Sequence, residues 1–83
     1  GNIFILCSFD DNENTYIFNT NKRTFSLIDE LDVIPYVLNF NDAYIVASNE
    51  AIELTINRVS GKAVLENKVR KSGACKLTNK TKF

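Results

Sequence analysis

The chain has 83 residues, no net charge at pH 7 and a hydrophobic content of 45%, values that suit one small folded domain and argue against intrinsic disorder. It contains no histidine, so the usual serine and cysteine nucleophile arrangements lack their general base, and we predict that the chain is not an enzyme. No apolar run is long enough to span a bilayer, which excludes a membrane-embedded helix.

Short segments with strand character alternate with polar turns in the first part of the chain. Residues 2–9 form a nearly continuous apolar run, which suits a strand buried on both faces or a first strand facing the core. Residues 10–14 are all Asp, Asn or Glu and predict a turn. Strands are predicted again at 15–19 and 24–28, joined by a turn at 20–23.

Residues 29–34 have two interpretations. An acidic loop between strands is preferred, because the segments on both sides alternate like strands. A short helix near residues 27–34 is the alternative, with Ser26 as its N-cap and Pro35 ending it at or before Ile34.

The second half of the chain predicts two further strands, at 36–40 and 43–48, and then a β-hairpin. Apolar and polar residues alternate over 52–58, so one face of that strand is apolar. Residues 59–61, Val-Ser-Gly, fit a three-residue hairpin loop whose glycine takes positive φ without steric cost. The returning strand is predicted at 63–65.

The last part of the chain is polar and basic. A short edge strand is predicted at 74–77, and residues 78–83 are predicted to be a frayed tail. Turn signals recur about every eight to twelve residues, as in all-β domains. We therefore predict one all-β domain over residues 1–83, an antiparallel meander of six to seven strands that closes as a small barrel or sandwich.

The two cysteines, Cys7 and Cys75, stand almost at opposite ends of the chain. Their spacing does not fit a redox motif, and without histidine a zinc site would need carboxylates to complete it. A disulfide that ties the first strand to the last is the preferred interpretation, and closing a loop of this size stabilises a domain by roughly 4 kcal/mol. Two buried free thiols are the alternative.

One segment has a pattern related to a calcium loop. Asp10, Asn12 and Asn14 alternate like the first ligands of such a loop. Thr15 stands where the loop needs glycine and Asn21 where it needs a bidentate Glu, so a turn rich in Asn and Asp is preferred. We predict neither a metal site nor a cofactor.

Charge is divided unequally along the chain. Residues 1–57 carry nine acidic and two basic side chains, a net charge of −7, whereas residues 58–83 carry eight basic side chains and Glu66, a net charge of +7. Either the basic part lies across the acidic part and the charges cancel, or it contacts a protein or an anionic ligand. Nucleic acid is disfavoured, because Phe83 is the only aromatic residue after Tyr44. The candidate contact residues are Arg58, Lys62, Lys68, Arg70, Lys71, Lys76, Lys80 and Lys82.

Three features together carry a resemblance: Cys7 in the first strand, the hairpin segment Leu-Thr-Ile-Asn-Arg-Val-Ser-Gly at 54–61, and Gly73-Ala74-Cys75 ahead of a Lys82-Phe83 terminus. The chain resembles a loose group of small, uncharacterised secreted bacterial proteins. These have a cysteine-bearing first strand, an Asn-Arg-x-Ser/Thr-Gly hairpin and a closing Gly-x-Cys segment. The resemblance implies an exported, disulfide-closed β domain and carries no known activity.

The chain begins at Gly1 and contains no Met, so we expect that an upstream segment was removed. A secretory signal peptide is preferred over excision from a larger protein, which places the domain in the periplasm or outside the cell; the cytoplasm is the alternative. We expect a binding domain that uses a strand edge or its basic face. Polyanion or nucleic-acid binding through residues 58–83, and a non-catalytic fragment of a larger protein, are the alternatives.

Overall fold

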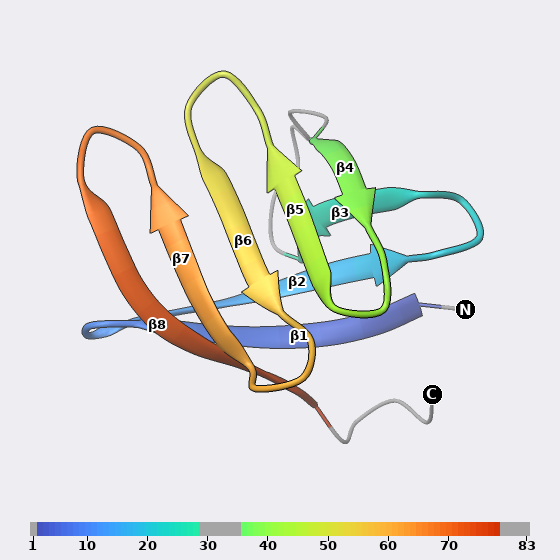
Figure 1. Ribbon diagram of the computed structural model, residues 1–83, viewed down its shortest axis with the longest axis horizontal. Helices are drawn as coiled ribbons and strands as arrows, with labels where there is room; N and C mark the ends of the chain where they lie inside the picture. Colours follow the sequence, from blue (N-terminus) through green and yellow to red (C-terminus); the bar gives the residue numbers. More distant parts are fainter. Residues whose placement is uncertain (1, 29–35, 79–83) are drawn as a thin grey trace.

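The computed structural model describes residues 2–28 and 36–78 (Figure 1). Within these ranges all neighbouring strands pair antiparallel in one sheet of order β3-β2-β1-β8-β7-β6-β5-β4, and there is no helix. The predicted all-β antiparallel fold is confirmed, with eight strands instead of six to seven. The strands are β1 (Asn2–Phe9), β2 (Asn12–Asn19), β3 (Thr24–Leu27), β4 (Val37–Phe40), β5 (Tyr44–Ser48), β6 (Glu53–Asn57), β7 (Lys62–Glu66) and β8 (Arg70–Leu77).

The last strand differs most from the prediction. The sequence predicts a short edge strand at 74–77, whereas β8 has eight residues and pairs with a neighbour on each side. Its polar first half was not recognised as a strand. In an antiparallel sheet with one solvated face, polar side chains can occupy the outward positions, and Arg70 and Ser72 are both exposed.

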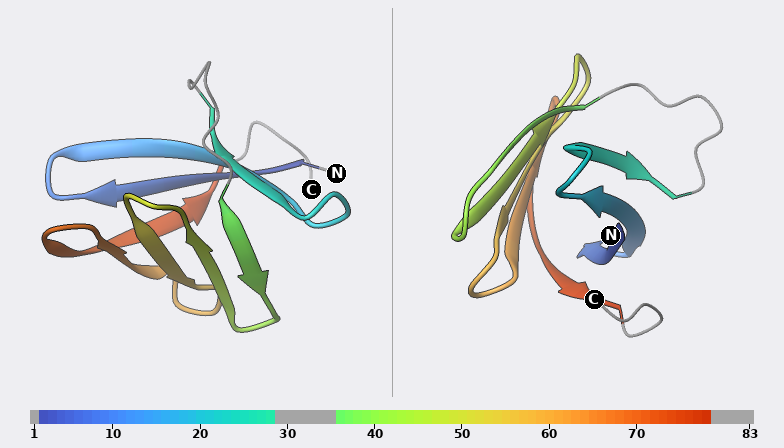
Figure 2. Two further views of the ribbon diagram at one scale, coloured as in Figure 1. Left: turned by 90° about the horizontal axis from the view of Figure 1, so that it is seen from above. Right: turned by 90° about the vertical axis from the view of Figure 1, so that its right-hand side faces the viewer.

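The sheet bends along strand β8. Its first half pairs with β7 and its second half with β1, and Ala74 pairs with both. Two layers result, β1–β3 and β4–β7, which are joined along β8 and face each other in Figure 2 (right), and whose strands cross in the view of Figure 1. At Gly73 a Cβ atom would overlap the carbonyl oxygen of Ser8 and come within 2.5 Å of the Phe9 ring. Glycine therefore lets the layers approach at this corner.

The hydrophobic core lies between the two layers. Strand β1 is buried mainly on one face, because Ile5, Cys7 and Phe9 are buried whereas Phe4 and Leu6 are half-buried. The apolar run therefore forms a first strand that faces the core, and not a strand that is buried on both faces. The buried residues of the core are Ile5, Cys7, Phe9, Tyr16, Phe18, Phe25, Ile45, Ala47, Leu54, Ile56 and Ala63.

Aromatic side chains bring the two edges of the sheet together, so that the sheet is nearly closed and barrel-like. Strands β3 and β4 are the two edges in the sheet order. The rings of Phe18 and Phe40 meet edge to face with centroids 5.1 Å apart, and those of Phe25 and Tyr36 do so at 5.5 Å. The guanidinium carbon of Arg23 lies 4.7 Å from the Phe40 centroid. Such ring contacts stabilise beyond their buried area.

Asparagine side chains shape most of the turns, as their clustering in the sequence suggests. In each case the side-chain oxygen accepts backbone N–H groups two or three residues ahead, the pattern of an Asx turn. The asparagines that do so are Asn19, Asn41, Asn49, Asn57 and Asn67.

The predicted β6–β7 hairpin is confirmed, with a longer loop than expected. Residues 58–61 separate the strands, so Arg58 belongs to the loop and not to the strand. Gly61 has φ of 79°, and its N–H donates to the carbonyl oxygen of Asn57 at 2.8 Å. A Cβ atom on Gly61 would come within 2.6 Å of the Cys75 carbonyl oxygen. Glycine is required here both by the backbone and by the neighbouring strand.

Two predictions fall largely outside the described residues. Most of the alternative helix near 27–34 does so; Leu27 ends β3, and the N–H of Ile28 donates to the Thr15 carbonyl oxygen at 3.0 Å. Of the predicted frayed tail 78–83, only Thr78 is described. Its N–H donates to the Phe4 carbonyl oxygen at 3.1 Å, which extends the β1–β8 contact.

Candidate functional site

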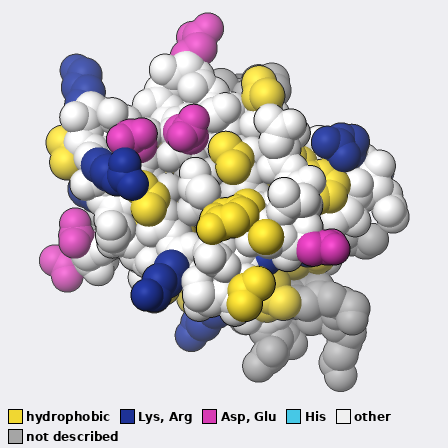
Figure 3. All heavy atoms as spheres, in the orientation of Figure 1, with side chains coloured by type: hydrophobic (Ala, Val, Ile, Leu, Met, Phe, Trp, Pro, Cys, Tyr) yellow, Lys and Arg dark blue, Asp and Glu magenta, His cyan; other side chains and the backbone are white. Residues whose placement is uncertain are grey.

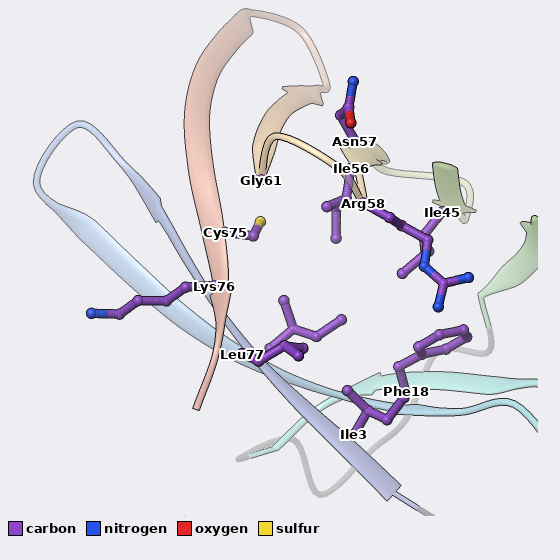
Figure 4. Close-up of a pocket in the computed structure, with 11 residues that line it drawn as sticks. Ile3, Phe18, Ile45, Ile56, Asn57, Arg58, Gly61, Cys75, Lys76 and Leu77 are labelled. Atoms are coloured by element: carbon purple, nitrogen blue, oxygen red, sulfur yellow. The ribbon is translucent and has the colours of Figure 1, made fainter. Parts of the chain in front are cut away.

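A groove of about 200 Å³ opens where the two layers and the β6–β7 loop meet. Five strands contribute its walls, and in Figure 4 the labelled side chains of Ile45, Ile56 and Phe18 lie around the open space. The wall is mainly apolar, as in small-molecule sites generally. Its apolar side chains are Ile3, Ile5, Phe18, Ile45, Ile56 and Leu77.

Arg58 supplies a positive charge to this groove. Its backbone N–H donates to the Ala43 carbonyl oxygen at 2.8 Å, and its Nη1 donates to the Asn41 carbonyl oxygen at 2.6 Å. Its guanidinium carbon lies 5.9 Å from the centroid of the Phe18 ring, toward which the side chain points in Figure 4. Two contacts thus hold the guanidinium at the groove, and they leave several of its N–H donors free.

Among the described residues that line the groove, none is acidic. Asp42 belongs to the β4–β5 turn that holds Arg58, but the ion pairs of the described residues do not include one between them. Since an ion pair would satisfy the guanidinium internally, its absence leaves Arg58 able to meet an external anion.

The disulfide borders the same groove. Cys7 and Cys75 face each other in the β1–β8 register, and their sulfur atoms are 2.06 Å apart. The predicted pairing is confirmed. The N–H of Cys75 donates to the Gly61 carbonyl oxygen at 2.6 Å, so it points toward β7 and away from β1. Cys7 and Cys75 therefore form a non-hydrogen-bonded pair, the arrangement in which opposite Cα atoms come closest.

The predicted basic contact residues fall into two groups at opposite ends of the β7–β8 hairpin. Arg58, Lys62 and Lys76 lie at the groove end, whereas Lys68, Arg70 and Lys71 lie at or beside the β7–β8 turn. Among the described acids none pairs with the first group. Lys80 and Lys82 are outside the described residues.

The basic residues around the β7–β8 turn are partly neutralised. Arg70 lies 3.8 Å from Glu66, and Lys71 lies 4.0 Å from Asp10. The second pair links the acidic and basic parts of the chain, as the charge-cancelling interpretation expects. Both pairs are exposed, so each contributes little to stability.

The basic side chains do not form one continuous surface on the face shown in Figure 3. This face is the outer side of β4–β8, where acidic and basic side chains are interspersed around apolar ones. Val46, Thr55 and Val64 follow one another there as cross-strand partners. A polyanion would meet both signs of charge on this face.

Tyr16 has a strongly shifted pKa. Burial raises its pKa to about 12, with a further contribution from Tyr36, while a hydrogen bond with Asn14 opposes the shift. Its ring stacks on Phe25 with centroids 5.0 Å apart. Tyr16 is therefore a core residue and not part of the groove.

Other kinds of site find little support within residues 2–28 and 36–78. They contain no cluster of three or more Cys, His, Asp or Glu side chains that could hold a metal ion. They also contain no helix that is long and apolar enough to cross a membrane. The three alternating residues of the calcium-like segment are divided between a turn, with Asp10 at φ of 54°, and strand β2.

Comparison with protein-family models, curated proteins and solved structures was made with the whole chain. No match was found. The resemblance to small secreted proteins stays a prediction, and the function has to be argued from the groove. The sequence predicted Arg58 as a contact residue but did not predict the groove. The apolar residues of its walls lie on separate strands, and each has the pattern of an ordinary core position.

Proposed function

We propose that this chain is an exported domain that acts by binding, without catalysis, and that its groove recognises an anionic ligand with an apolar part. The single observation that carries the proposal is the position of Arg58. Its guanidinium is held beside an apolar wall, and no acid pairs with it among the described residues. Apolar walls with a few oriented polar groups are the usual composition of small-ligand sites.

The chemistry of the groove favours binding over reaction. Its polar side chains are those of Arg58, Asn57 and Lys76. The arginine side chain has no acceptor atom, and the Asn57 side-chain oxygen already accepts N–H groups from Val59 and Ser60. In Figure 4 the Lys76 side chain points away from the groove. No general base therefore faces the space where a ligand would lie.

Anilinonaphthalene sulfonate is a suitable probe, because it combines one negative charge with apolar rings, and the groove is open to solvent, so that only part of the molecule has to enter it. We expect saturable binding with one site per chain and a rise in its fluorescence. Arg58→Gln should weaken this binding about tenfold, since one charge-assisted hydrogen bond is lost. Lys68→Gln is the matched control, because it removes a positive charge at the opposite end of the hairpin. Equal affinity for the wild type and Arg58→Gln would refute the groove as the site.

The export part of the proposal is supported by the disulfide, since disulfides persist in oxidising compartments. Protein isolated from its native source with thiols alkylated at lysis should take up no alkylating reagent until reductant is added. Uptake at Cys7 and Cys75 without reductant would instead place the domain in a reducing compartment, and it would contradict export.

Polyanion binding is the second candidate, carried by Lys62 and Lys76, which have no ion-pair partner among the described residues. It predicts retention on heparin at low salt and a steep loss of binding as salt rises. Failure of the protein to bind heparin at low salt would eliminate it and leave the groove proposal unaffected.

A further inference from the structure

We propose, building on the function proposed above, that the ligand of the groove is a free monocarboxylate with an unbranched chain of about six carbons, the carboxyl carbon included. Three properties of the groove lead to this class: its volume, its single inward-facing charge and the chemistry of its walls.

The volume sets the size of the ligand. A cavity of about 150 Å³ lined by apolar side chains accommodates benzene. The groove here measures about 200 Å³, so in proportion it accommodates about eight non-hydrogen atoms. That is the size of hexanoate, and it is too small for a long-chain fatty acid to be enclosed completely.

The charge sets the head group. Of the described side chains of the lining, Arg58 alone brings a positive charge toward the open space in Figure 4, because Lys76 points away. One guanidinium matches one carboxylate, with which it forms paired hydrogen bonds.

The walls set the tail. Five of the six apolar side chains are Ile or Leu. The one aromatic side chain, Phe18, already contacts Phe40 and Arg58 with its ring. Phe18 is only 1% exposed, so the described part of the lining offers little aromatic surface to a ligand ring, and a flexible aliphatic chain fits these walls better than an aromatic acid does.

The test measures binding of butanoate, hexanoate, hexanol and hexylamine to the full chain by calorimetry and by backbone amide NMR shifts. We expect hexanoate to bind with amide shifts at Arg58, Gly61 and Leu77. Butanoate should bind roughly fifteenfold more weakly, because it has two methylenes fewer to bury. Hexanol should lose about tenfold and hexylamine should not bind. Equal binding of hexanol and hexanoate would overturn the assignment of a carboxylate.

Leu77 allows a matched charge pair, since it lines the groove yet is 55% exposed, so that polar residues are tolerated. We expect Leu77→Glu to abolish hexanoate binding and Leu77→Lys to retain or strengthen it. Two variants with the same effect would contradict an anion in the groove. Far-ultraviolet circular dichroism of both variants measures whether they fold. A folded Leu77→Glu variant excludes unfolding as the cause of its loss of binding.

The outcomes separate this inference from the function on which it rests. Binding of anilinonaphthalene sulfonate that depends on Arg58, together with no binding of hexanoate, would overturn the ligand class and leave the groove as a site. Loss of Arg58 dependence for both ligands would overturn both proposals. Tighter binding of a short peptide with a free C-terminal leucine than of hexanoate would overturn the assignment to a free acid.

Discussion

The bond between Cys7 and Cys75 closes a loop with a sequence separation of 68 residues, and its removal is the largest single perturbation of stability that we predict. The loop-closure entropy that the bond removes from the unfolded chain corresponds to roughly 4 kcal/mol at this loop length. A domain of this size has a free energy of unfolding of about 5–15 kcal/mol. Reduction should therefore remove a large fraction of the stability.

Urea denaturation followed by far-ultraviolet circular dichroism, with and without reductant, measures this loss. With a slope of about 1 kcal/mol per molar urea, the midpoint should fall by roughly 3–4 M. The control is the double variant Cys7→Ala/Cys75→Ala, which should unfold like the reduced wild type and be insensitive to reductant. A decrease in the free energy of unfolding below about 1 kcal/mol on reduction would refute the loop-closure argument.

Three further predictions concern single residues. Gly73→Ala should destabilise by about 2 kcal/mol or more in urea titration, because its Cβ would overlap the Ser8 carbonyl oxygen at the corner; a neutral effect would show that the two layers can separate there without cost. Asn57→Ala should cost about 1 kcal/mol in the same assay, since two N–H groups lose their acceptor, whereas Asn39→Ala, at an exposed strand position, should have a smaller effect. Tyr16 has a pKa of 10.0 when unfolded and about 12 when folded, so its contribution to stability is complete below pH 10 and is lost as the pH rises through 12. Thermal melts should fall over this range in the wild type and less in Tyr16→Phe, and equal slopes would contradict the assignment to Tyr16.

Much of the local structure was predictable because it depends on residues close together in the chain. The β6–β7 hairpin follows from alternation over 52–58 and from Gly61, which has positive φ as expected. The turns follow from asparagines whose side chains bond to N–H groups only two or three residues away. The cysteine pairing was predictable for a different reason, since only two cysteines exist.

The errors lie where a residue's environment depends on distant strands. Strand β8 was predicted short and at an edge, because its polar first half has no apolar face of its own to indicate a strand. The hairpin loop was predicted one residue too short, because the alternation over 52–58 does not show where β6 ends; Arg58 bonds to Ala43 and Asn41 of the β4–β5 turn. Neither bond partner can be identified from the residues next to Arg58.

The amino-acid sequence by itself determined the strand-forming segments, the turns and the covalent link between the ends, since each needs only local pattern or the count of cysteines. Tertiary structure alone decided that the sheet folds along β8 beside Gly73, and that Arg58 is held next to Phe18 at an apolar groove. The physical reason is that residues from five strands form this groove, and their distances depend on how the sheet closes and not on any one segment.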